Sequence, residues 1–272
     1  MMQLPPKIDS GRLSVVLAAI LLAYSLTPFV TIPNRELNFQ LPGFLFLLRI
    51  DYTGFVSILS AGLGATGMSW LLQSRQKEVP KGGEFQHYLL PALTAWAIGV
   101  PLGALEINLQ WWVVFVFGGL LLGAIFNAEY IVVDIKDIRA PLAIIGLSAV
   151  GYAIYLTLCV ALRGAGMRLN LFLPVLFITA GMVSWRVMNL RLPGEKHFHW
   201  SVATALLTTQ AAIGLHYLPI TPVQFGLILT GLCYAVISLA ILVRFKNKLR
   251  KNWVEPVFIL VLFLAMALLF KT

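Results

Sequence analysis

Residues 222–244 read PVQFGLILTGLCYAVISLAILVR and carry no charge before Arg244. A helix needs about 20 apolar residues to cross the hydrocarbon core of a bilayer, which cannot solvate free backbone N–H and C=O groups. The whole chain of 272 residues shares this composition, with 59% hydrophobic residues, 11% charged residues and a mean hydropathy of +0.87. Soluble proteins usually contain about 25% charged residues. The sequence therefore predicts a polytopic integral membrane protein and excludes a soluble globular or disordered chain.

Nine stretches are long and apolar enough, or nearly so, to be interpreted as membrane spans. The connections between them are short, so residues 1–272 are predicted to form a single membrane domain, an all-α transmembrane helical bundle. The longest connection, 33–52, has an apolar core too short to cross and is expected to lie in the outer membrane interface. The predicted spans are 13–32, 53–73, 88–106, 111–132, 141–163, 170–188, 201–218, 222–244 and 254–270.

The distribution of Lys and Arg predicts the orientation of the chain. Cytoplasmic loops of membrane proteins collect these residues. With nine spans, only five of the 20 Lys and Arg residues fall on one side of the membrane. We therefore expect a cytoplasmic N-terminus, an outer C-terminus and a location in the cell membrane. The five predicted outer cations are Arg35, Arg49, Arg163, Arg168 and Lys271.

Small residues at helical spacing occur in the second and fourth predicted spans. Such residues let helix backbones approach closely in lipid, where no hydrophobic effect drives helix association. We expect them to make contacts within one bundle rather than between subunits. They are Ser57, Ser60, Ala61, Gly64 and Ala65 in the second span, and Gly119 and Gly123 in the fourth.

The most polar stretch beside a span is 127–139, which contains Asp134 and Asp137. If the fourth span continued as a helix through it, these two carboxylates would share one face at the cytoplasmic headgroup level. They could then hold Mg²⁺ against a lipid phosphate or an isoprenoid diphosphate, with Arg139 and Arg186 contacting the phosphate. The alternative is an ordinary loop in which the two Asp side chains pair with neighbouring cations.

The same stretch, 127–139, resembles the Asp-rich motifs of the UbiA-type prenyltransferases, which have a similar length and nine helices. That family carries its acidic motifs in the loops after the second and sixth helices. Here those loops read SRQKEVPKGGEFQH and RLPGEKHFHW, without an Asp. We therefore do not assign the chain to that family, and an Mg²⁺-dependent enzyme stays one alternative function.

A second alternative is a carrier of ions or small solutes. Pro101 removes a hydrogen bond from the third predicted span, and Glu106 follows it at the outer boundary. Gln210 adds a polar group to the middle of the seventh span. The competing interpretations are a helix end whose Glu reaches water and a Gln that hydrogen-bonds a neighbouring helix.

A basic run follows the eighth span and is expected to contact anionic lipid headgroups at the cytoplasmic face. The net charge of +9 arises largely from this topological bias, so no nucleic-acid partner is predicted. The histidines lack the spacing of a zinc or haem site and are expected to be solvated, so no cofactor is expected beyond Mg²⁺ in the enzyme alternative. The basic residues are Arg244, Lys246, Lys248, Arg250 and Lys251.

No nucleophile elbow, zinc-protease helix or phosphate-binding loop is present in the sequence. Short loops and scarce charge inside the spans favour a non-catalytic membrane bundle. We expect it to be a subunit of a larger assembly or a scaffold for lipid and a membrane-protein partner.

Overall fold

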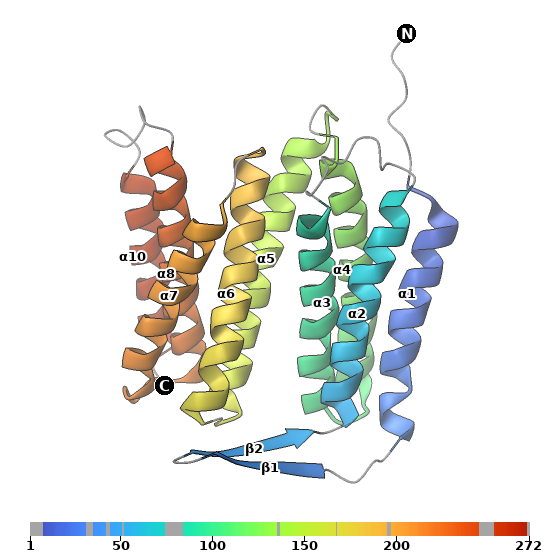
Figure 1. The fold of residues 1–272 in the computed structure, drawn as a ribbon, viewed down its shortest axis with the longest axis horizontal. Helices are drawn as coiled ribbons and strands as arrows, with labels where there is room; N and C mark the ends of the chain where they lie inside the picture. Colours follow the sequence, from blue (N-terminus) through green and yellow to red (C-terminus); the bar gives the residue numbers. More distant parts are fainter. Residues whose placement is uncertain are drawn as a thin grey trace. The chain divides into compact units, whose positions relative to one another are not determined.

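The computed structural model describes residues 8–30, 35–41, 44–50, 52–73, 84–134, 137–166, 168–194, 197–244 and 253–270. Within these residues the chain forms nine α-helices and one β-hairpin (Figure 1). Its contacts divide it into two compact units, Met1–Val133 and Asp134–Thr272, and each is described by itself. The helices of the first unit are α1 (Ser10–Ser25), α2 (Tyr52–Leu72), α3 (Phe85–Ala104) and α4 (Leu109–Val132). Those of the second are α5 (Ala140–Gly164), α6 (Leu169–Arg191), α7 (Phe198–His216), α8 (Pro222–Arg244) and α10 (Val254–Leu269).

Each predicted span overlaps one of these helices, and most of the ends differ by at most three residues. The exception is the first span, predicted as 13–32, because α1 ends at Ser25 and a 3-10 turn follows it. Six helices are long and apolar enough to cross a membrane: α1 together with the 3-10 turn Thr27–Phe29, then α2, α4, α5, α6 and α8. The apolar helix α10 has 16 residues and is shorter than a span. The chain is therefore a helical membrane protein by length and composition, whereas the count of nine spans and the sides of the termini stay predictions.

In the first unit, α2 packs along α3 and α1 packs against both α2 and α4. A Cβ atom added at Gly64 of α2 would lie 2.9 Å from the carbonyl oxygen of Pro91 in α3, so the two backbones nearly touch. Ser57 and Ser60 are buried on the same face. This confirms that small residues mediate packing within one bundle. The buried face differs from the predicted one, because Ala61 and Ala65 are only half-buried.

The two glycines of α4 also pack inside the first unit. Cβ atoms added at Gly119 and Gly123 would lie 3.0 and 3.3 Å from the side chains of Leu21 and Leu17 in α1. The core of this unit is formed by large apolar side chains with almost no exposed surface. They include Ile20, Tyr24, Met68, Leu122 and Phe126.

In the second unit, α5, α6, α7 and α8 form a bundle, and α10 packs along α8. Two glycines of α8 permit these contacts. A Cβ atom at Gly226 would lie 2.6 Å from Val160 of α5, and one at Gly231 would lie 2.6 Å from Phe263 of α10. Helix α8 is thus the element that joins α10 to the bundle.

Residues 33–52, predicted as a non-spanning segment, contain the hairpin of β1 (Arg35–Leu41) and β2 (Phe44–Ile50). The strands are antiparallel, with Arg35 opposite Ile50 and Leu41 opposite Phe44. The sequence RELNFQL alternates polar and apolar residues, the period of a half-buried strand. This alternation is typical of a strand and accounts for β1, whereas β2 reads FLFLLRI and does not alternate. The position of the segment at the membrane interface stays a prediction.

Candidate functional site

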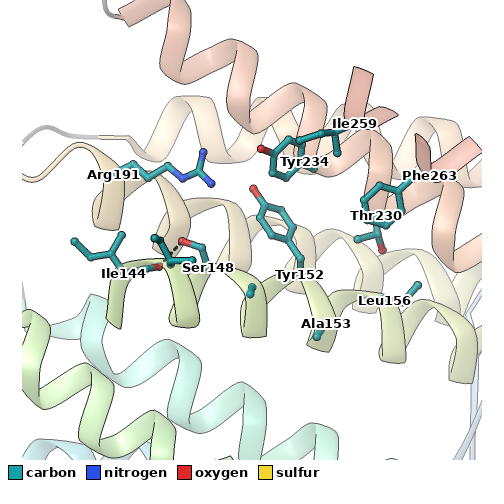
Figure 2. Close-up of a pocket in the computed structure, with 12 residues that line it drawn as sticks. Ile144, Ser148, Tyr152, Ala153, Leu156, Arg191, Thr230, Tyr234, Ile259 and Phe263 are labelled. Carbon is teal, nitrogen blue, oxygen red and sulfur yellow. Dashed lines mark hydrogen bonds between the residues drawn. The ribbon is translucent and has the colours of Figure 1, made fainter. Parts of the chain in front are cut away.

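The second unit contains a cavity of about 530 Å³ between α5, α8 and α10, close to the end of α6 (Figure 2). This volume lies within the usual range of roughly 300–1,000 Å³ for small-molecule sites. Most of its lining is apolar, and we call it the tyrosine pocket. It is lined by Ile144, Ile145, Ser148, Ala149, Tyr152, Ala153, Leu156, Arg191, Thr230, Tyr234, Ile259 and Phe263.

One end of the tyrosine pocket is polar and cationic. Arg191, the last residue of α6, has its guanidinium carbon 5.9 Å from the centre of the Tyr234 ring. The Tyr152 ring lies 5.3 Å from the same ring, and its hydroxyl points toward the space beside Arg191 (Figure 2). Tyr234 donates a hydrogen bond to Glu255 at 3.0 Å. The hydroxyl of Tyr234 is therefore engaged, whereas Arg191 and Tyr152 face the cavity.

Two hydroxyl groups in the lining have no hydrogen-bond partner among the described residues. They belong to Tyr152 and Thr230, and both oxygen atoms are buried. A buried polar group without a partner costs about 1–3 kcal/mol, and native structures contain few of them. Each hydroxyl could therefore hydrogen-bond a polar ligand in the cavity.

The other end of the tyrosine pocket is mostly apolar, although the Thr230 hydroxyl also lies there (Figure 2). Leu156 of α5 and Phe263 of α10 lie there, away from Arg191 (Figure 2). A cavity with a cation at one end and aliphatic and aromatic side chains at the other matches an amphiphile with an anionic head. The arrangement can bind and orient such a molecule. Among the described residues, the lining contains no carboxylate, thiol or imidazole that could act as a nucleophile or a base.

Sequence reasoning did not find this pocket. From the sequence, Arg191 was only one of the 15 Lys and Arg residues on the predicted cytoplasmic side and had no predicted binding role. A signal was nevertheless present, because Ser148 with Tyr152 and Thr230 with Tyr234 form two polar pairs at i,i+4 spacing inside apolar spans. Residues at that spacing lie on one face of a helix.

The structure does not continue α4 through the predicted Asp-rich site, since α4 ends at Val132. Both carboxylate oxygens of Asp137 accept hydrogen bonds from Arg139, from Nε at 3.1 Å and from Nη2 at 2.7 Å. These hydrogen bonds raise the pKa of Arg139 above its ordinary value. A cation at Asp137 would have to displace Arg139, and the Mg²⁺ site with Asp134 stays a prediction.

Arg186 was the second residue, after Arg139, predicted to contact the phosphate. It is only 1% exposed, so its side chain lies inside the second unit. Among the described residues, no three His, Cys, Asp or Glu side chains form a group that could hold a metal ion.

The residues of the predicted carrier lie apart from the tyrosine pocket. Glu106 is exposed in the turn between α3 and α4, and Pro101 lies inside α3 without ending it. Gln210 is on the exposed face of α7. Of the predicted basic headgroup site only Arg244 is described, exposed at the end of α8, while Lys246, Lys248, Arg250 and Lys251 lie outside the described residues.

Three of the four histidines are buried or half-buried, contrary to the expectation that they are solvated. His87 of α3 is 4% exposed, and its Nδ1 lies 3.0 Å from Oε2 of Glu129 in α4, which is 0% exposed. His197 is also buried and donates from Nε2 to the carbonyl oxygen of Leu192 at 2.8 Å. The His87–Glu129 pair joins α3 to α4 inside the first unit and was not predicted.

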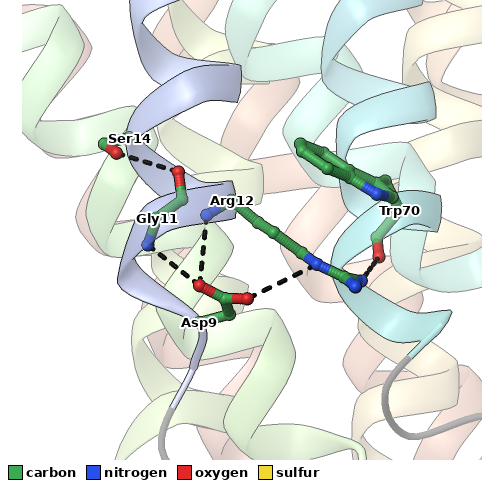
Figure 3. A network of polar contacts seen from close by, with 5 residues as sticks. All are labelled: Asp9, Gly11, Arg12, Ser14 and Trp70. Carbon is green, nitrogen blue, oxygen red and sulfur yellow. Dashed lines mark hydrogen bonds and ion pairs between the residues drawn. The ribbon is translucent and has the colours of Figure 1, made fainter.

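The start of α1 has a polar network with α2 (Figure 3). Asp9 accepts hydrogen bonds from the backbone N–H groups of Gly11 and Arg12 at 3.0 and 3.3 Å, and so caps the helix. The Arg12 side chain lies 3.4 Å from the Asp9 carboxylate and donates to the carbonyl oxygen of Trp70 at 3.1 Å. Asp9 therefore both caps α1 and orients the residue that contacts α2.

We expect Asp9→Ala to lower the free energy of unfolding by about 1 kcal/mol, the usual effect of losing an N-cap side chain. Asp9→Asn retains the capping oxygen and removes only an exposed ion pair, so it should cost less than about 1 kcal/mol. Denaturant unfolding of the purified protein in detergent measures both values. Equal destabilisation by the two variants would show that the charge of Asp9 matters and the cap does not.

A family model matches residues 32–270, and its description is "Protein of unknown function (DUF5656)". A search of the curated proteins found no match, and a search of the solved structures found none either.

Proposed function

The chain belongs to the DUF5656 family, whose description gives no activity, and we propose that it is a non-catalytic membrane protein that binds an anionic lipid in the tyrosine pocket. The observation that carries this proposal is the polarity of the pocket, which changes from Arg191 and Tyr152 at one end to Phe263 and Leu156 at the other. On the predicted topology Arg191 lies at the cytoplasmic headgroup level of the cell membrane. An anionic headgroup there would contact the guanidinium, and one lipid chain would lie along α5 and α10.

The headgroup supplies most of the selectivity in this proposal. A lipid chain that enters the pocket leaves a bilayer of similar polarity, so its transfer contributes little free energy. Hydrogen bonds to a charged group contribute about 1.5–3 kcal/mol each. Among the described residues, Arg191 has no hydrogen bond or ion pair that would compete with a lipid phosphate. Tyr152 adds a neutral donor beside it.

Binding of phosphatidylglycerol, measured by native mass spectrometry against phosphatidylcholine, tests the proposal. We expect Arg191→Gln to weaken phosphatidylglycerol binding about tenfold, equivalent to about 1.4 kcal/mol, and to leave phosphatidylcholine binding unchanged. We expect Ala153→Phe to weaken the binding of both lipids, because the larger side chain fills the cavity. Leu142→Phe is the matched control, since Leu142 is on the same helix, 76% exposed and outside the pocket lining.

Two outcomes would contradict the proposal. One is unchanged phosphatidylglycerol binding by both Arg191→Gln and Ala153→Phe. The other is an equal loss of binding in Leu142→Phe, which would assign the effect to the general lipid-facing surface. Turnover of a bound lipid by the purified protein would refute the claim that the protein is non-catalytic, but not the claim that the tyrosine pocket binds an anionic lipid.

A further inference from the structure

A second, smaller cavity of about 230 Å³ lies in the second unit where α5 ends and α6 begins. Three of its six lining residues have basic side chains, and none of the six lines the tyrosine pocket. Its lining residues are Leu162, Arg163, Gly166, Arg168, Phe172 and His216.

The turn between α5 and α6 brings the two arginines to one cavity. Gly166 has φ +61, a left-handed conformation that other residues adopt only with strain, and its N–H donates to the carbonyl oxygen of Arg163 at 3.2 Å. The chain reverses there within a few residues. Arg163 in the last turn of α5 and Arg168, the N-cap residue of α6, therefore line the same cavity.

Arg163 also determines which nitrogen of His216 carries a proton. Its Nη1 lies 3.0 Å from Nδ1 of His216. A guanidinium can only donate, so Nδ1 must accept and the neutral imidazole carries its proton on Nε2. Arg163 donates as well to the carbonyl oxygen of Leu218 at 3.4 Å, and its guanidinium carbon lies 5.6 Å from the ring centre of Phe225. Arg163 is thus held in place by α7 and α8.

The described part of the second unit provides no carboxylate at this cavity. Asp134 and Asp137 precede α5, whereas Arg163 lies in its last turn, and a helix of 25 residues is about 37 Å long. Glu255 contacts Tyr234 of the tyrosine pocket. Among the described residues, the Arg168 side chain has no hydrogen bond or ion pair. The two guanidinium charges therefore have no counterion among the described residues of this unit.

We propose that this cavity binds a phosphate group through Arg163, Arg168 and His216. Guanidinium groups match the geometry of phosphate oxygens, and two of them with an imidazole N–H supply donors from three side chains. Arg163 and Arg168 are also two of the five predicted outer cations, the side where Lys and Arg are disfavoured unless they have another role. The phosphate belongs either to free inorganic phosphate or to the headgroup of a lipid.

Two measurements distinguish these sources. Isothermal titration of the detergent-solubilised protein with inorganic phosphate tests free phosphate. Native mass spectrometry with phosphatidylglycerol, performed in an Arg191→Gln background so that the tyrosine pocket contributes little, tests the headgroup. Binding in either arm supports the proposal and identifies the source of the phosphate. Absence of binding in both arms overturns it.

We expect Arg163→Gln and Arg168→Gln each to weaken that binding about tenfold. Arg168→Gln keeps the test decisive if Arg163→Gln fails to fold, because the Arg168 side chain makes no hydrogen bond to another described residue, and its backbone contacts at the start of α6 are unchanged by the substitution. Arg12→Gln in the first unit is the matched control and should retain the phosphate affinity of the unmodified protein. Equal losses in Arg12→Gln and Arg168→Gln would show a general charge effect and would overturn the site.

Discussion

Glu129→Ala is expected to destabilise the protein by about 1–3 kcal/mol, the usual cost of leaving a buried polar group without its hydrogen-bond partner. The carboxyl group of Glu129 is 0% exposed and lies 3.0 Å from Nδ1 of His87, whose side chain is 5% exposed. His87 would keep a buried polar ring without the acceptor that it contacts in α4.

Two further variants show whether the loss of stability comes from the lost polar contact or from the lost side-chain volume of Glu129. Glu129→Gln keeps a side chain of the same shape with an oxygen that can accept from His87, so it should lose less stability than Glu129→Ala. The double variant His87→Phe with Glu129→Leu replaces both polar groups by apolar ones and should recover part of the loss. Denaturant unfolding in detergent measures all three. A midpoint for Glu129→Ala equal to that of the unmodified protein would contradict a stabilising role of the pair.

Gly64→Ala is expected to destabilise the first unit by about 1–3 kcal/mol through overpacking. The added methyl group would lie 2.9 Å from the carbonyl oxygen of Pro91 and 3.3 Å from the Cα atom of Ala92. These are backbone atoms, so no side chain can rotate away to make room. Helices α2 and α3 would have to separate along a contact that buries Ser57 and Ser60 as well.

Gly62→Ala is the matched control for this prediction. Gly62 lies on the same helix, only two residues away, and a Cβ atom there has no heavy atom within 4 Å. The same chemical change should therefore be neutral, or stabilising by up to about 1 kcal/mol because alanine favours helix more than glycine. A lower thermal midpoint for Gly64→Ala together with an unchanged or higher midpoint for Gly62→Ala, measured in one detergent, would confirm the packing argument. Equal shifts would contradict it.

The helices could be predicted from the sequence because the bilayer imposes a minimum length on each apolar stretch. The stretch 222–244 coincides with α8 (Pro222–Arg244), and the other predicted spans differ from their helices only at the ends. The fourth predicted span, 111–132, ends at the same residue as α4, Val132. The condition for the Mg²⁺ alternative, that this helix continues through Asp134 and Asp137, is not met in the structure, where Asp137 accepts hydrogen bonds from Arg139.

The contacts between helices could not be predicted to the same extent. Spans that are apolar on every side have no amphipathic pattern to show which face meets a neighbour. For this reason Ala61 and Ala65 were expected in the packed face of α2 as much as Ser60 and Gly64. The tyrosine pocket depends on such contacts, since Arg191, Tyr152 and Tyr234 belong to three different helices.

Helix α10 packs along α8. Part of the wall of the tyrosine pocket therefore comes from a helix that is not one of the four bundle helices. Ile259 and Phe263, which α10 contributes to the tyrosine pocket, belong to a helix outside the bundle of α5 to α8. Substitutions at these two positions can reshape the ligand space while the four-helix core keeps its own interfaces. The shape of the tyrosine pocket therefore depends in part on a few residues of one peripheral helix.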